Sequence, residues 1–332
     1  MRRRDFLLAA AILAPTLRSA RAQSVAKKRI AVVSPSTKVA EMKIGENNPY
    51  GELLSELKQL GYVEGENLIV DRYSGDGNQE RYTELALEVI ATKPEVIFSQ
   101  GTPMTLRFKR NTTTIPIVAL TGDPIRFGIV TSLANPGGNV TGVSVDAGIE
   151  IWAKRLAFLI EAAPKVTSIV FVATKGGWDG PGGRATREAA QKLGISLVSA
   201  LVPSPFNEAE YKRTLNSIQS NLVGGVVMSD EGETYSNRAM ILEWVKQVRA
   251  PAIFPYRDMT EAGGLMSYSW SIRSVARSHA MLIAKILRGA NPGDLPYMQE
   301  ARFEFVLNLK AAKSLGLDIP SALVAQADTV IE

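Results

Sequence analysis

Residues 94–102 read PEVIFSQGT, and this stretch decides the fold class. Its apolar centre is typical of a short buried strand, and Gly101 interrupts the run just before a segment of helical character that starts at Thr102. A second apolar run at residues 115–120 predicts another strand. A strand, a helix and a strand in this order predict a β-α-β unit of a parallel sheet.

The same alternation extends in both directions from this unit. We expect strands at residues 28–35, 67–73, 94–100, 115–120, 139–145, 168–174, 195–202, 224–228, 251–255 and 265–269. We expect helices at residues 50–60, 82–92, 152–162, 185–193, 208–220, 238–248 and 275–287. The pattern restarts near residues 144–148, so it predicts an α/β protein with two Rossmann-like lobes, each built on a parallel sheet.

The N-terminus has the three parts of a secretory signal peptide. Residues 2–7 read RRRDFL, which resembles a twin-arginine motif, and the apolar stretch continues to residue 17. Small residues precede an expected cleavage site after Ala22, so residues 1–23 are the predicted signal. The apolar stretch is shorter than the roughly 20 residues that a membrane-spanning helix needs. We therefore expect a periplasmic protein that is exported by the twin-arginine route.

Charge and cysteine content limit the class of function. The chain holds 38 Lys and Arg against 33 Asp and Glu, but the predicted signal alone holds five Arg and one Asp. Its removal leaves 33 basic and 32 acidic residues, so the high isoelectric point is no sign of nucleic-acid or anionic-membrane binding. The sequence contains no cysteine, which excludes disulfides, thiolate metal sites, cysteine nucleophiles and a lipid anchor on an N-terminal cysteine.

Candidate ligand-binding residues lie on or just after the expected strands. Open parallel sheets bind ligands at the carboxyl ends of their strands, where loops and helix N-termini converge. Small hydroxyl residues and glycine suit an anionic group there, carboxylates suit an ammonium group, and aromatic rings suit an apolar portion. The candidates are Ser34, Ser99, Gln100, Gly101, Thr102, Thr121, Asp123, Trp178, Asp230, Tyr256 and Tyr268. An alternative is that the Ser, Gly and Asp residues only cap helices and shape turns.

Signals for catalysis, metal binding and cofactors are weak. The single histidine, His279, lies in an expected helix and is interpreted as a core or helix-face residue. The glycine-rich segment at residues 176–184 lacks both common nucleotide-binding patterns and is interpreted as a mobile loop at the mouth of the cleft. We therefore expect no catalytic residue, no metal and no cofactor, although two carboxylates from different loops leave a hydrolase open.

Several short runs along the chain carry a family resemblance. They are GYVEGEN at 61–67, PEVI at 94–97, IPIV at 115–118, DP at 123–124, NPGGNVTGV at 135–143, AKILRGANP at 284–292 and NLKAAKSLGLDIP at 308–320. Together they resemble the ABC-transporter substrate-binding family that includes tryptophan-binding proteins. The resemblance implies a type 1 periplasmic-binding-protein fold, with three crossings between the lobes near Val145, Trp270 and Arg302. It implies one lobe at residues 28–145 plus about 270–301, and the other at residues 146–269 plus about 302–332.

The resemblance also implies a function. The protein would capture a small molecule, an amino acid or another aromatic or carboxylate-bearing solute, between its lobes and deliver it to an ABC permease in the inner membrane. A monomer without catalytic activity or nucleic-acid binding is expected. Three alternatives stay open: a periplasmic sensing module for a membrane receptor, a secreted enzyme on the same scaffold, and a solute chaperone without a transporter.

Overall fold

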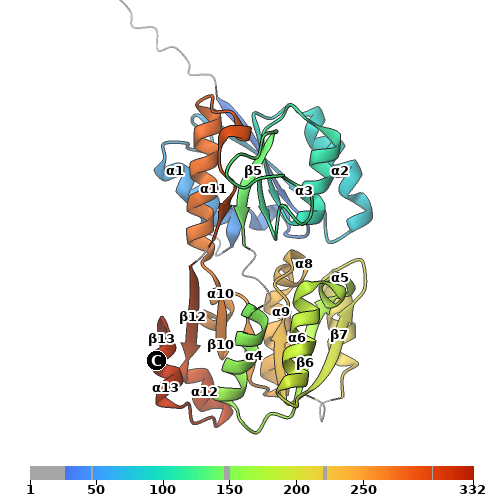
Figure 1. The fold of residues 1–332 in the computed structure, drawn as a ribbon, viewed down its shortest axis with the longest axis vertical. Helices are drawn as coiled ribbons and strands as arrows, with labels where there is room; N and C mark the ends of the chain where they lie inside the picture. Colours follow the sequence, from blue (N-terminus) through green and yellow to red (C-terminus); the bar gives the residue numbers. More distant parts are fainter. Residues whose placement is uncertain (1–26, 46–47, 146–149, 220–222, 301) are drawn as a thin grey trace, which may run out of the picture.

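Two β-sheets organise the chain into two lobes, which lie one above the other in Figure 1. The computed structural model describes residues 27–332 except 46–47, 146–149, 220–222 and 301. The predicted signal peptide lies outside the described residues. Within the part of the chain that is described, no helix is both long and apolar enough to cross a bilayer.

Lobe 1 is built on a six-stranded sheet whose paired strands are all parallel. The strand order is β11-β5-β4-β3-β1-β2. The strands are β1 (Lys28–Ser34), β2 (Leu68–Ser74), β3 (Val96–Gln100), β4 (Ile117–Thr121), β5 (Val140–Ser144) and β11 (Met298–Gln299). The chain starts at β1, moves to β2 on one side and then to β3, β4 and β5 on the other. This is the doubly wound order of a Rossmann-like lobe.

Lobe 2 is built on a seven-stranded sheet in the order β13-β12-β10-β9-β8-β6-β7. The strands are β6 (Ser168–Thr174), β7 (Ser196–Val202), β8 (Gly225–Met228), β9 (Ala252–Phe254), β10 (Met266–Trp270), β12 (Phe303–Asn308) and β13 (Thr329–Ile331). Strand β12 runs antiparallel to β10, while the other pairs are parallel. The two lobes with mostly parallel sheets confirm the predicted fold class.

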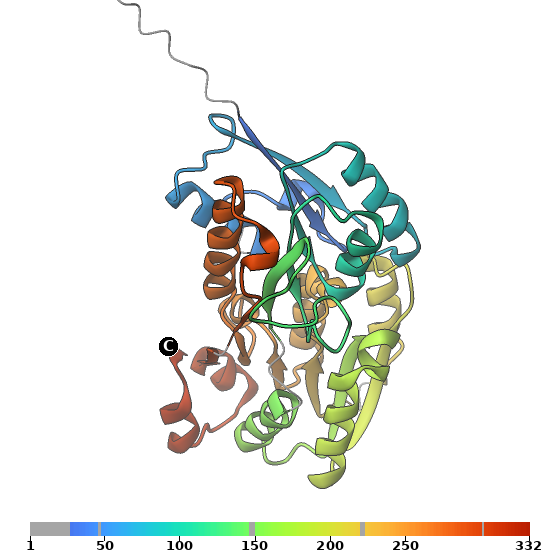
Figure 2. The ribbon, with the colours of Figure 1, turned by 45° about the horizontal axis from the view of Figure 1, so that its top comes forward.

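Helices cover both faces of the lobe 1 sheet (Figure 2). Successive residues of a strand point to opposite faces, so Val32 packs in one apolar cluster and Val33 in the other. The helices on the first face are α1 (Pro49–Gln59) and α11 (Ile272–Leu287), and those on the second are α2 (Tyr82–Ala91) and α3 (Thr102–Asn111).

The sequence around α1 shows how local signals fix a helix. The side chain of Asn48 accepts hydrogen bonds from the backbone N–H groups of Tyr50 and Gly51, and Pro49 stands at the first helical position. Just beyond the helix, Gly61 has φ +88°, a left-handed conformation that favours glycine and stops the helix there.

Lobe 2 has the same layered arrangement. Phe171 of β6 packs in the cluster on one face of the sheet, and Val172 packs in the cluster on the other face. The helices on the first face are α4 (Glu150–Ala162), α6 (Pro181–Lys192), α12 (Leu309–Leu315) and α13 (Ser321–Gln326), and those on the second are α7 (Glu208–Asn216) and α9 (Arg238–Val248).

The chain passes between the two sheets three times. It leaves lobe 1 after β5, returns after β10 to form α11 and β11, and leaves again to form β12. Helix α11 therefore packs beside α1 in lobe 1 although it follows ten strands in sequence. These three passages are the crossings that the family resemblance implies.

Several short elements were not anticipated from the sequence. The segment expected as a mobile loop forms the short helix α5 (Lys175–Asp179), and α6 follows directly from Pro181. The mobile-loop prediction is wrong because Thr174 caps α5 by accepting a hydrogen bond from the N–H of Gly177. The other elements that were not anticipated include α8 (Gly232–Ser236), α10 (Arg257–Glu261) and the 3-10 turns η1 (Val39–Glu41), η2 (Gln79–Arg81) and η4 (Pro292–Asp294). After α11, the strands β11, β12 and β13 and the helix α12 were not anticipated either.

Candidate ligand-binding site

Loops at the carboxyl ends of strands in both sheets meet between the lobes. Gly232, at the start of α8 in lobe 2, lies so close to lobe 1 that an added Cβ would be 3.0 Å from Cγ of Pro35. The same Cβ would be 3.9 Å from Nε2 of Gln100, at the end of β3. The carboxyl ends of the strands in the two sheets therefore face one another. In open parallel sheets, ligands bind at this end of the strands.

Ser34 and Ser99 use their hydroxyl groups inside lobe 1. The Oγ of Ser34 accepts hydrogen bonds from the N–H groups of Ser36 (3.2 Å) and Thr37 (2.8 Å). The Oγ of Ser99 lies 3.0 Å from Oγ1 of Thr105. Both serines are fully buried, so in this conformation they shape the loops that follow β1 and β3.

Thr121 and Asp123 also serve the local backbone of lobe 1. The Oγ1 of Thr121 lies 2.6 Å from the hydroxyl of Tyr297, and both groups are buried. The Oδ1 of Asp123 accepts hydrogen bonds from the N–H groups of Ile125 (2.9 Å) and Arg126 (3.0 Å). These two residues hold the loop after β4 in its shape.

The segment 100–102 presents the functional groups of β3 toward lobe 2. Tyr50 donates its hydroxyl proton to Oε1 of Gln100, which fixes the amide plane and leaves its N–H groups on the side of Gly232. Gly101 has φ +88° and leads into α3, and the Oγ1 of Thr102 accepts a hydrogen bond from the N–H of Gly122 (3.3 Å). The side chain of Gln100 therefore lies close to the α8 segment of lobe 2.

Asp230, Tyr256 and Tyr268 come together in lobe 2 around a residue that was not predicted, Arg155. Arg155 Nε donates a hydrogen bond to the carbonyl oxygen of Tyr268 (2.8 Å), and Arg155 Nη1 lies 3.6 Å from Oδ2 of Asp230. The guanidinium carbon stands 4.6 Å from the ring centre of Trp152. Tyr256 donates its hydroxyl proton to the carbonyl oxygen of Asp230 (2.9 Å), which holds the loop after β8 against β9.

Burial sets the electrostatics of this group. The Arg155 side chain is fully buried, and desolvation lowers the pKa of its guanidinium, while the carboxylate of Asp230 acts in the opposite direction. A guanidinium starts from so high a pKa that it stays charged inside a protein. Burial raises the pKa of the Tyr256 hydroxyl well above its ordinary value, so this group remains a neutral hydrogen-bond donor. Lobe 2 therefore holds one buried cation beside one partly exposed carboxylate.

The two remaining aromatic rings pack into lobe 2 itself. The ring of Trp178 lies 5.9 Å from that of Phe171, and the guanidinium of Arg187 covers it at 4.4 Å. The ring of Tyr268 packs edge-on against Phe158 at 5.3 Å. Trp178 and Tyr268 are both half-buried, so each keeps part of its surface outside these contacts.

Two carboxylates that were not predicted connect the loop after β8 to its surroundings. Glu231 accepts hydrogen bonds from the N–H of Thr174 (3.0 Å) and the hydroxyl of Ser229 (2.9 Å). Desolvation, and then the nearby charge of Glu233, raise the pKa of Glu231. Glu233 accepts a hydrogen bond from the hydroxyl of Tyr82 in lobe 1 (3.0 Å). The loop that follows β8 therefore also makes a contact between the two lobes.

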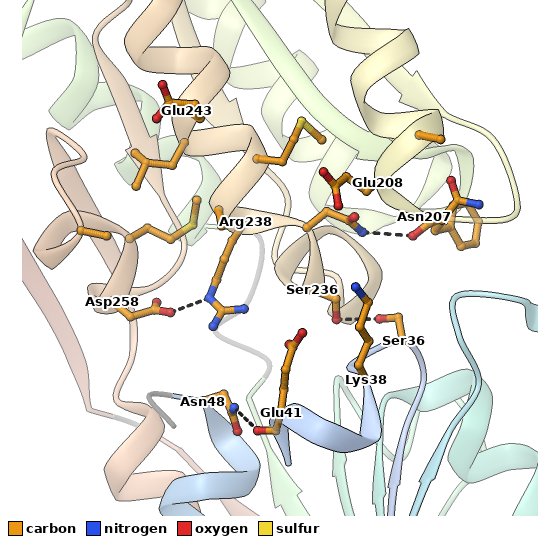
Figure 3. Close-up of a pocket in the computed structure, with 18 of the residues that line it drawn as sticks. Ser36, Lys38, Glu41, Asn48, Asn207, Glu208, Ser236, Arg238, Glu243 and Asp258 are labelled. Carbon is orange, nitrogen blue, oxygen red and sulfur yellow. Dashed lines mark hydrogen bonds and ion pairs between the residues drawn. The ribbon is translucent and has the colours of Figure 1, made fainter. Parts of the chain in front are cut away.

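A groove of about 1130 Å³ lies beside these strand ends and also has walls from both lobes (Figure 3). Its polar lining includes Ser36, Lys38, Glu41 and Asn48 from lobe 1, and Asn207, Glu208, Ser236, Arg238, Glu243 and Asp258 from lobe 2. Arg238 and Asp258 are bonded to each other at 2.8 Å, and none of the eleven predicted residues lines the groove. We centre the candidate site on the strand ends, because there the buried cation Arg155 has no carboxylate within hydrogen-bond distance among the residues that the structure describes.

Arg155 was missed because the search was restricted to strand ends, whereas this residue lies on helix α4. The sequence did hold a signal. Ile151, Leu156 and Leu159 mark the buried side of α4, and Arg155 falls on the same side at helical spacing. A charged residue on the buried stripe of a helix is uncommon and calls for a partner or a function.

His279 takes no part in this site. It is buried in lobe 1, with Nε2 3.2 Å from the carbonyl oxygen of Ala119 and its ring 5.0 Å from that of Phe98. Burial lowers the pKa of His279 to about 4, so it is neutral at pH 7. It is a core residue. Within the described ranges, no group of three His, Asp or Glu side chains is arranged to hold a metal ion.

Comparisons with known proteins identify the family. The profile of the family described as ABC transporter substrate binding protein matches residues 46–331. A tyrosine-binding protein of Clostridioides difficile (strain R20291) is 23% identical over 279 residues, covering 81% of this chain and 76% of that protein.

Two solved structures show the same architecture. A conserved domain protein from Vibrio cholerae superposes with a TM-score of 0.76 at 25% identity, covering 92% of this chain and 99% of the other. An ABC domain from Streptococcus pneumonia in complex with L-Trp superposes with a TM-score of 0.75 at 21% identity, covering 92% and 100%. Because the family profile spans most of the sequence, this chain belongs to the ABC transporter substrate-binding protein family.

Proposed function

We propose that the protein is the periplasmic solute-binding component of an ABC import system. It captures a small molecule, an amino acid or another aromatic or carboxylate-bearing solute, and delivers it to a permease in the inner membrane. The observation that carries this proposal is the arrangement of two separate sheets whose strand ends face each other across the loops of Gln100 and Gly232. A solute held there touches both lobes at once.

Binding and lobe closure are coupled in this mechanism. A ligand that contacts both lobes stabilises the state in which the lobes are together, because only that state provides both sets of contacts. Three chain passages connect the lobes, so the lobes turn about these passages as two rigid bodies. The permease then distinguishes the closed protein from the open one by the relative position of the two lobe surfaces.

Two similar proteins whose ligands are named support an amino acid as the solute. The curated relative is a tyrosine-binding protein, and one structural neighbour was solved with L-Trp. Neither is an enzyme by its description, and we propose that this chain likewise binds without catalysis and acts as a monomer.

Its route to the periplasm is proposed from the N-terminus, with twin-arginine export and cleavage near Ala22. The lobe boundaries are proposed at residues 28–145 plus about 270–301 and at residues 146–269 plus about 302–332.

The test uses the mature chain, purified without the signal, and a panel of amino acids, aromatic acids and small carboxylates. A ligand that binds only the folded state raises the midpoint of thermal unfolding, and its affinity is then measured by calorimetry. Small-angle scattering should show a smaller radius of gyration with the bound solute. Binding without compaction, or release of a chemically altered solute in mass spectrometry, would contradict the proposal.

A further inference from the structure

The guanidinium of Arg155 has unused hydrogen-bonding capacity in the interior of lobe 2. The residue is 0% exposed, and its Nε is bonded to the carbonyl oxygen of Tyr268. Among the described residues, neither Nη1 nor Nη2 has a hydrogen-bond partner, and both atoms are buried. Buried N–H groups without an acceptor cost free energy, which an anionic partner would recover.

Asp230 does not supply that partner. Its Oδ2 lies 3.6 Å from Arg155 Nη1, which gives a charge contact but exceeds hydrogen-bond length. The Asp230 side chain keeps 37% of its surface exposed, whereas Arg155 keeps none. The pair is therefore open to solvent on the side of Asp230 and closed on the side of Arg155.

We propose, building on the function above, that Arg155 binds the anionic group of the solute and Asp230 binds its cationic group, so that the site selects a zwitterion with both charges close together. Each single-charge solute leaves one group unsatisfied. A plain carboxylate would satisfy Arg155 but meet the like charge of Asp230, and a plain amine would satisfy Asp230 but leave Arg155 without acceptors. A compact zwitterion, such as an α-amino acid, satisfies both groups.

Neighbouring residues hold the pair in place before ligand arrives. The ring of Trp152 stacks under the guanidinium, and Gly182 of α6 lies so close to that ring that an added Cβ would be 2.5 Å from it. Tyr256 fixes the backbone carrying Asp230 through its hydroxyl. A site that is preorganised in this way binds with a smaller entropy cost than one that must be ordered by the ligand.

The experiment compares three related probes for each of two ring systems by calorimetry. The zwitterions are L-tryptophan and L-tyrosine, the amines are tryptamine and tyramine, and the carboxylates are indole-3-propionate and 3-(4-hydroxyphenyl)propionate. The wild-type protein should bind at least one zwitterion more tightly than either matched single-charge probe, by about 30-fold or more, since hydrogen bonds to charged groups are strong.

Two variants separate the two roles. Arg155→Met should weaken zwitterion binding by about 30-fold or more while leaving the affinity of the matched amine unchanged or tighter, because the amine lacks the group that Arg155 binds and no longer meets its like charge. Asp230→Asn should weaken zwitterion binding while leaving the matched carboxylate unchanged or tighter. Because Asp230 is partly exposed, we expect Asp230→Asn to fold. It therefore tests the proposal even if Arg155→Met does not fold. Lys154→Met, which removes an adjacent exposed cation over the Tyr268 ring, is the matched control and should change none of the affinities.

The outcomes separate this inference from the proposed function. Equal losses for all three probes in Arg155→Met would show a purely structural residue and overturn the inference. The inference would also be overturned if the wild-type protein bound a neutral solute or a single-charge probe more tightly than the zwitterion. Closure around that preferred solute would leave the solute-binding function in place. Wild-type protein that binds no solute of any panel would overturn both.

Discussion

The hydroxyl of Tyr82 on α2 donates a hydrogen bond to the carboxylate of Glu233 on α8 at 3.0 Å, and these two residues belong to different lobes. Both are buried. Beside them, the hydroxyls of Ser36 and Ser236 lie 2.8 Å apart across the same boundary. The lobes thus have a direct contact that does not depend on a solute, and this contact shifts the balance toward the closed arrangement.

Removing the Tyr82 hydroxyl should open the protein. A hydrogen bond to a charged group contributes about 1.5–3 kcal/mol, so Tyr82→Phe should lower the ratio of closed to open molecules in the ligand-free protein by roughly ten-fold or more. The ligand-free radius of gyration, measured by scattering, should increase, and saturating solute should restore the wild-type value. Tyr73→Phe, on β2 of lobe 1, is the control. An unchanged radius in Tyr82→Phe would show that this contact does not hold the lobes together.

Gly142 should tolerate no side chain. It pairs with Ala119 between β5 and β4, and an added Cβ would lie 2.0 Å from the carbonyl oxygen of Ala119. The sheet would have to separate locally, so Gly142→Ala should lower the free energy of unfolding by about 3 kcal/mol or more in urea titrations. Gly138→Ala is the matched control because nothing lies within 4 Å of its added Cβ. Equal stabilities of the two variants would contradict this account of the β4–β5 spacing.

Two glycines of α5 can be used to test how closely the buried carboxylate of Glu231 packs against this helix. In α5, an added Cβ on Gly177 would lie 2.2 Å from Oε2 of Glu231, whereas one on Gly176 finds its nearest neighbour at 3.4 Å. Gly177→Ala should therefore displace Glu231 and destabilise the protein by about 1–3 kcal/mol. Gly176→Ala should be neutral or stabilising by up to about 1 kcal/mol, since alanine favours helix. Thermal unfolding distinguishes the two, and a stabilised Gly177→Ala would contradict the tight contact.

His279 should make stability depend on pH. Its pKa is about 4 in the folded protein against 6.5 for the ordinary side chain, so the unfolded chain binds the proton first as pH falls. Stability from this group is complete above pH 6.5 and is lost between about pH 6.5 and pH 4, by about 3 kcal/mol. His279→Gln should lack this part of the pH dependence in urea unfolding. A parallel decline in both proteins would mean that the pKa of His279 is nearly the same in the folded and unfolded states.

Sequence patterns predicted the long elements better than the short ones. Buried strands such as β1 and β3 are continuous apolar runs that end at polar residues. Both features can be recognised from the amino-acid sequence alone. Helices α5 and α8 have the sequences KGGWD and GETYS, which favour helix weakly. Contacts between residues far apart in sequence support both helices: Glu231 accepts a hydrogen bond from the N–H of Thr174, the cap residue of α5, and Ser236 of α8 lies against Ser36.

The structure brings the predicted residues together at strand ends that face the other lobe, but it leads the individual side chains to different partners. Hydroxyl and carboxylate groups at strand ends can either face a ligand or bond to the loop, and the sequence does not distinguish these cases. Ser34 and Asp123 bond to their own loops, while Asp230 is left partly exposed. Arg155 comes from a helix, and its neighbours Asp230 and Tyr268 are more than 70 residues away in sequence, so only the fold shows that they meet.

The return of α11 to lobe 1 has a consequence for biosynthesis. Ile283 and Ile286 of this helix cover the same face of the first sheet as Ile30 and Val32. While a ribosome is still making lobe 2, α1 covers that face without α11, so the first lobe cannot be completed before most of the chain exists. Neither lobe is a continuous piece of polypeptide, and the two must mature together.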